Sequence, residues 1–206
     1  MALRLSTGFR DKIMTPAADG GLSWADLLED GVIKVFSGNQ PSSSNDEELG
    51  THLFTLTRQG GDEQTSGELT VGDMYLIVDY KAGDDFTNIG APANQTGVVF
   101  KATGTTAETY TNESVLRKDV GLVFGNATEG KIAVNAGDAW RGTVLNSGIA
   151  GWFRFYNDDI ETGEDATAIR FDGRVATSGG EMALPVLSVT EGSTQTVDNF
   201  SITMPA

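Results

Sequence analysis

Large apolar and polar residues alternate with a period of two in the stretches 151–157, 168–175 and 199–204. This alternation is typical of a β-strand that is buried on one face. Clusters of Gly, Asp, Asn, Ser and Thr lie between these stretches and are typical of turns. Because a strand at the end of a chain usually needs a partner to stay ordered, we expect 199–204 to pair within a sheet.

Short apolar or alternating runs of the same kind recur along the chain, separated by turn residues at intervals of about 8–12 residues. The pattern predicts a mainly β protein, an antiparallel β-sandwich or jelly roll with one short helix. The strands expected upstream of those above are 32–36, 52–57, 69–80, 97–102, 109–116, 120–124, 131–134 and 140–145.

One helix is predicted by its end signals. Ser23 precedes it as a cap, Asp26 follows three residues later as in a capping box, and Gly31 suits a left-handed end. In the stretch 3–13, apolar residues recur at helical spacing, so we interpret it as an arm or a short helix.

The texture of the chain changes after the Gly-rich stretch 59–67 and again at the charged stretch 117–119. We expect residues 68–118 to form an inserted small β-subdomain, since loops tolerate such insertions. Residues 1–67 and 119–206 would then be the two parts of the main β-domain. The predicted core of that domain is Ile33, Val35, Phe54, Leu56, Val144, Phe153, Phe155, Ile169, Phe171, Phe200 and Ile202.

The chain is strongly acidic, with 29 Asp and Glu against 14 Lys and Arg and a formal charge of −15. Few cations are present to replace phosphate counterions, so we expect no nucleic-acid partner and no anionic membrane surface. There is no Cys, which excludes disulfides and thiolate chemistry and favours assembly in a reducing cytoplasm. Neither a signal peptide nor an apolar run of membrane-spanning length is visible.

Few residues are candidates for catalysis or ligand binding, and we expect no enzymatic activity, no cofactor and no metal site. The only His, His52, is either a catalytic base or a residue at the end of a half-buried strand. The acidic loop 157–165 and the pair Asp84–Asp85 are either cation ligands or solvated loops. Trp140, Trp152 and Tyr156 would suit a carbohydrate platform.

A subunit interface is the favoured interpretation of the row formed by Trp152, Arg154 and Tyr156, because Trp, Tyr and Arg are enriched at contact hot spots. Packing of a second layer on this face is the alternative.

Several stretches resemble structural proteins of tailed bacteriophages. In the main domain they are 1–8, Gly31-Val-Ile-Lys-Val-Phe-Ser-Gly-Asn-Gln-Pro41, Ala150-Gly-Trp-Phe-Arg-Phe155 and 196–206. The stretches 71–75, 82–90 and 97–106 look like a β module that is grafted into many phage virion proteins.

The resemblance implies a non-enzymatic virion protein, assembled in the cytoplasm of the host bacterium. We expect a capsid decoration (cement) protein that binds the outer surface of a phage head as a homo-oligomer, with the major capsid protein and copies of itself as partners. The alternatives are a tail or baseplate component, or a carbohydrate-binding adhesion module on the virion.

The stretch 1–10 is a candidate clamp across a neighbouring subunit, and packing on its own sandwich is the alternative. Together with the aromatic row, the predicted partner interface is Leu3, Arg4, Leu5, Phe9, Arg10, Trp152, Arg154 and Tyr156.

Overall fold

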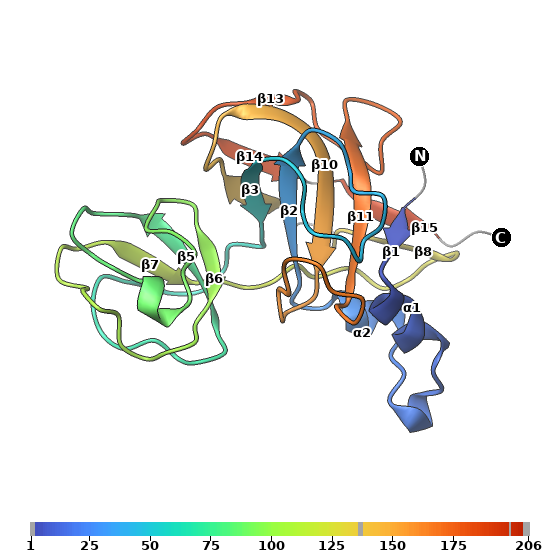
Figure 1. Ribbon diagram of the computed structural model, residues 1–206, viewed down its shortest axis with the longest axis horizontal. Helices are drawn as coiled ribbons and strands as arrows, with labels where there is room; N and C mark the ends of the chain where they lie inside the picture. Colours follow the sequence, from blue (N-terminus) through green and yellow to red (C-terminus); the bar gives the residue numbers. More distant parts are fainter. Residues whose placement is uncertain (1–2, 136–137, 198, 204–206) are drawn as a thin grey trace.

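The computed structural model describes residues 3–135, 138–197 and 199–203. Several antiparallel sheets and two α-helices make up a mainly β, sandwich-like fold, which confirms the predicted fold class. The chain forms two lobes, a main lobe and an inserted lobe, which lie side by side (Figure 1).

The largest sheet lies in the main lobe and has the strand order β1-β11-β10-β2-β3. Its central strand β10 pairs with β2 on one side and with β11 on the other, so that Phe155 lies opposite both Ile33 and Phe171. Two short strands extend it, β12 beside β11 and β13 beside β10. The bounds are β1 Arg4–Leu5, β2 Val32–Ser37, β3 His52–Leu56, β10 Gly148–Tyr156, β11 Arg170–Ala176, β12 Met182–Ala183 and β13 Ser188–Val189.

Two strand pairs cover the inner face of this sheet. Strand β14 (Thr194–Val197) pairs with β9 (Trp140–Thr143), and β15 (Ser201–Thr203) pairs with β8 (Lys131–Ala133). The strand predicted near the end of the chain is therefore confirmed for Ser201–Thr203, while position 204 lies outside the described residues.

The core between these layers is aromatic. The rings of Phe155 and Phe171 stack with their centroids 4.9 Å apart, and Phe153 meets Phe200 edge-on at 5.6 Å. Every residue predicted for the core is buried except Ile169, which is half-buried and packs against the same cluster.

The described residues contain two α-helices, where the pattern predicted one with clear end signals. Helix α1 (Thr7–Met14) falls in the stretch interpreted as an arm or short helix. Helix α2 (Trp24–Leu28) has the predicted capping box between Ser23 and Asp26. Short 3-10 helices lie at η1 (Ala17–Asp19) and η2 (Thr87–Ile89).

The predicted role of Gly31 as a left-handed helix end is wrong. Asp30 takes that conformation instead, with φ of +55°. Gly31 is required for space, because a Cβ at this position would lie 2.2 Å from the ring of Phe155 and 2.4 Å from the carbonyl oxygen of Tyr156.

The inserted lobe contains a separate sheet with the order β4-β7-β5-β6. The strands are β4 Glu63–Gln64, β5 Met74–Asp79, β6 Val99–Lys101 and β7 Val115–Lys118, so the sheet begins upstream of the expected start at residue 68. It has its own apolar cluster, which includes Tyr75, Phe86 and Leu116. Whether this lobe folds independently stays a prediction.

The two lobes share a buried apolar contact, which we call the seam. Met74, Leu76 and Val99 of the inserted lobe pack there against Val32 and Tyr156 of the main lobe. The lobes are therefore joined by packing as well as by the chain.

Candidate functional site

The row of Trp152, Arg154 and Tyr156 is buried, with exposed fractions of 0%, 0% and 1%. The predicted interface on this face is therefore wrong for the chain by itself. A loop, residues 38–50, covers the row, and the Trp152 indole N–H donates to the carbonyl of Leu49 at 3.1 Å. The Trp152 ring also stacks on Phe36 with centroids 4.6 Å apart.

Arg154 is at the centre of the buried face. Its guanidinium makes a two-point contact with Asp172, with Nε to Oδ1 at 2.6 Å and a terminal nitrogen to Oδ2 at 2.8 Å. Both side chains are 0% exposed. The remaining nitrogen donates to the Asp46 carbonyl at 2.8 Å and to Glu48 at 3.2 Å, so that Arg154 fastens the covering loop to the sheet.

Glu48 enters the same network from the covering loop. It accepts hydrogen bonds from the Tyr156 hydroxyl and from the Gly163 amide, the latter at 2.9 Å. Burial opposes ionisation of this carboxyl, but these two bonds and the charge of Arg154 outweigh it and lower the pKa of Glu48. Burial and the Glu48 charge raise the pKa of the Tyr156 hydroxyl, which is thus held as a donor.

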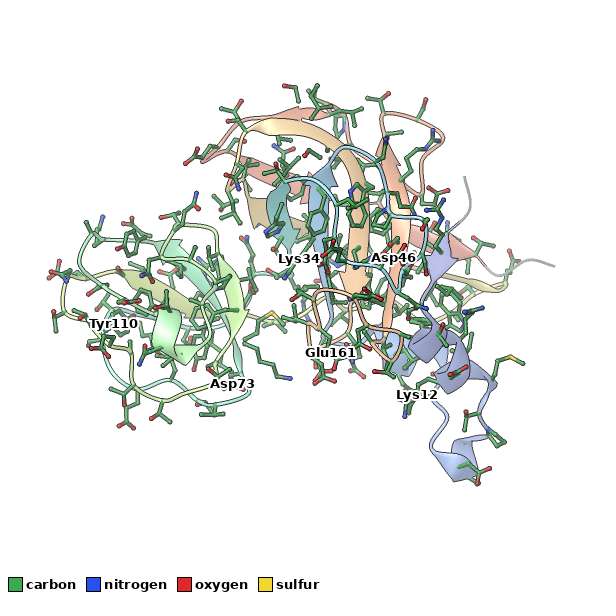
Figure 2. All side chains as sticks on the ribbon, viewed as in Figure 1. Lys12, Lys34, Asp46, Asp73, Tyr110 and Glu161 are labelled. Carbon is green, nitrogen blue, oxygen red and sulfur yellow. The ribbon has the colours of Figure 1, made fainter. Side chains whose placement is uncertain are left out.

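Arg170 of β11 joins two loops through backbone carbonyls. Its Nε donates to the Ser44 carbonyl at 2.6 Å, and a terminal nitrogen donates to the Gly163 carbonyl at 2.7 Å. Asp46 and Glu161, labelled in Figure 2, mark these two loops, 38–50 and 157–169, over the main sheet. The network thus uses its charges to hold both loops in place.

Residues 3–10 lie on the chain's own main sheet, as in the alternative interpretation. Strand β1 pairs with β11, and the buried Phe9 packs edge-on against Trp24 at 4.9 Å. Ser6 caps α1 and also donates from its hydroxyl to the Ala168 carbonyl at 2.7 Å. The described part of this stretch is therefore packed on its own lobe and is not a free arm.

The remaining interface candidates in this stretch differ in exposure. Leu3 and Leu5 are half-buried and pack against the main core. The Arg4 guanidinium donates to the Pro41 carbonyl, and Arg10, which is exposed, donates to the Thr7 hydroxyl at 3.1 Å.

Sequence reasoning missed a different exposed element, the connection between α1 and α2. It projects from the main lobe (Figure 1). Met14, the last residue of α1, is 81% exposed at its start, and Leu22, near its end, is 44% exposed. Two large apolar side chains on one projection are a candidate contact surface. The only sequence signal was an apolar residue on either side of a turn-rich break.

The carbohydrate platform is also excluded for the chain by itself. Trp140 is 0% exposed and packs in the main core against Phe124 and Phe200, so its ring faces cannot stack on a sugar. Trp152 and Tyr156 lie beneath the covering loop.

His52 stands at the start of β3, where its Nε2 lies 3.0 Å from the Thr55 hydroxyl. Burial and the nearby charge of Lys34 lower the pKa of His52 to about 4. The imidazole is therefore neutral at pH 7, and its hydroxyl neighbour lies on the same strand.

The acidic candidates take part in local hydrogen bonds and ion pairs. Asp84 accepts from the amides of Thr111, Asn112 and Ser114, and these bonds outweigh burial and lower its pKa to about 2. Asp85 accepts from the amide and hydroxyl of Thr87. Among residues 3–135, 138–197 and 199–203, no three His, Cys, Asp or Glu side chains gather as a metal site.

No protein-family model, curated protein or solved structure matches this chain. Within the part of the chain that the structure describes, no helix is long and apolar enough to cross a membrane.

Proposed function

We propose that the chain is a non-enzymatic structural protein of a tailed-phage virion, a decoration protein that binds and stabilises the outer surface of the head. Its partners are the major capsid protein and copies of itself. The observation that carries the proposal is the spatial arrangement of the segments that resemble phage proteins, which are far apart in the sequence.

In the main lobe, three of these four segments contribute strands to the main sheet, and the fourth, 196–206, contributes β15, which pairs with β8 over that sheet. Strand β2, from the stretch 31–41, pairs with β10, from the stretch 150–155. Strand β1, from the stretch 1–8, pairs with β11 at the edge of the same sheet. The segments that resemble a grafted module all lie in the inserted lobe (Figure 1). A scaffold with an appended module suits a protein that displays one lobe while another attaches.

The projection between α1 and α2 is the attachment surface we favour. Met14 and Leu22 offer exposed apolar area, while the aromatic row and Phe9 are already buried within the chain. A protein that binds only the assembled shell stabilises that shell through the free energy of binding.

The test is the position and copy number of the chain in purified virions, measured by quantitative mass spectrometry and by labelling with an antibody in electron microscopy. Many copies spread over the shell support the proposal. A few copies at the tail or baseplate favour that alternative position, and absence from the virion refutes both. Added protein should also raise the temperature at which heads lacking it break open.

A further inference from the structure

A cleft of about 680 Å³ lies between the two lobes. Val71, Val99 and Lys101 line it from the inserted lobe, and Lys34 and Ile160 line it from the main lobe. Figure 2 shows Lys34 on the side of the main lobe that faces the inserted lobe. This volume is within the range of roughly 300–1,000 Å³ that is usual for sites that bind small ligands.

The two lysines of the cleft differ in their partners. The Lys101 ammonium lies 3.5 Å from Asp158 and 3.6 Å from Asp159, so its charge is balanced within the chain. For Lys34, no hydrogen bond or ion pair is formed with any residue that the structure describes, and its Nζ lies 5.1 Å from the centre of the Tyr156 ring.

Glu48 is the carboxylate whose charge affects the pKa of Lys34, but Glu48 is hydrogen-bonded to other groups. Its oxygens accept from Tyr156, Gly163 and Arg154 in the network described above. Burial lowers the pKa of Lys34, and the charge of Glu48 opposes that shift only in part. An ammonium has three donors, and the face of a ring replaces the lost water only weakly.

We propose that this cleft binds a carboxylate joined to an apolar group. Lys34 donates hydrogen bonds to the carboxylate, and Val71, Val99 and Ile160 contact the apolar part. One ammonium without an anionic partner matches one negative charge, and Asp159 in the wall of the cleft would repel a second. The proposal is independent of the proposed function in the virion.

Two kinds of ligand carry a carboxylate joined to an apolar group: a free aliphatic carboxylate, and a glutamate flanked by apolar residues on a protein. The experiment titrates the ¹⁵N-labelled full chain with hexanoate, and in a second arm with a capped Val-Glu-Val peptide, at constant ionic strength. Amide resonances of Val99, Lys101 and Ile160 report binding. The tighter ligand identifies the source, and saturable shifts at these amides in either arm support the site.

Matched ligands distinguish the contribution of the carboxylate charge to binding from that of the apolar tail. Acetate has the carboxylate without the tail and should bind more weakly, by roughly fourfold for each methylene that enters the cleft. Hexylammonium has the tail with the opposite charge and should give no saturable shift at the cleft. Equal binding of hexanoate and hexylammonium refutes the role of Lys34.

Variants test Lys34 directly. Lys34→Met keeps the length of the side chain and should weaken hexanoate binding about 10- to 100-fold, the loss expected for a charge-assisted hydrogen bond. Lys34→Arg should restore most of the affinity, and Lys12→Met, on α1, should leave it unchanged. Thermal unfolding confirms that each variant is folded. Unchanged affinity in Lys34→Met, or no saturable shift with any carboxylate, overturns the proposal.

Discussion

Replacing Arg154 by Met tests whether the buried network holds the covering loop. The substitution leaves Asp172, which is 0% exposed, without the cation that contacts both of its oxygens. Breaking a buried ion pair by removing one partner costs about 3–5 kcal/mol, because the remaining charge is uncompensated. Urea unfolding at about pH 7.5 should show a loss of this size relative to the unchanged chain.

The pH dependence of this loss identifies its cause. Burial already raises the pKa of Asp172, and Arg154 opposes that rise. Without Arg154 the pKa of Asp172 in the folded state rises further above its unfolded value. A carboxyl with a raised folded pKa favours the folded state when protonated, so stability is lost as pH increases through that pKa. The deficit of Arg154→Met should therefore be smaller at about pH 5 than at about pH 7.5.

A matched control is Arg10→Met, which removes an exposed arginine from α1. This change should alter the free energy of unfolding by no more than about 0.5 kcal/mol. The reasoning is refuted if Arg154→Met costs less than about 1 kcal/mol, or if its deficit is the same at both pH values. Hydrogen exchange should also show faster opening of the loop 38–50 in this variant.

Other predictions concern the core, the inserted lobe, a buried carboxyl and the attachment surface. Phe155→Ala should cost about 3–5 kcal/mol in urea unfolding, and a cost under 1 kcal/mol would contradict its place in the core. Deleting 68–118 and joining Gly67 to Asp119 should leave a main lobe that unfolds cooperatively. Its free energy of unfolding should fall by roughly 2–5 kcal/mol, because the seam becomes exposed. A product without a cooperative transition would contradict this prediction. Burial raises the pKa of Asp119 to about 6, so its contribution to stability should fall as pH increases from about 4 to about 6, and Asp119→Asn should abolish that part of the pH profile. Met14→Lys places a cation that suits the C-terminal end of α1, and it should reduce sedimentation with phage heads while changing the free energy of unfolding by less than about 0.5 kcal/mol. Unchanged attachment would exclude the projection as the contact.

The sequence by itself determined the elements whose signals are local. Period-two alternation placed Phe153 and Phe155 on the inner face of β10, because side chains alternate across a strand. Ser23 and Asp26 indicated the start of α2, since both partners of a capping box lie within one turn. The mainly β class also followed from the recurrence of short strands and turns.

Only the tertiary structure decided what lies on the outer face of the sheet. Trp152, Arg154 and Tyr156 have the composition of an interface, and the loop that covers them has the composition of a solvated segment. Their partners in the covering loop are more than a hundred positions away, as in the contact of Arg154 with Glu48. Alternation reports which side chains share a face, but it carries no information on which distant loop, lobe or partner covers that face. The cleft at Lys34 arises for the same reason, because it exists only where two lobes meet.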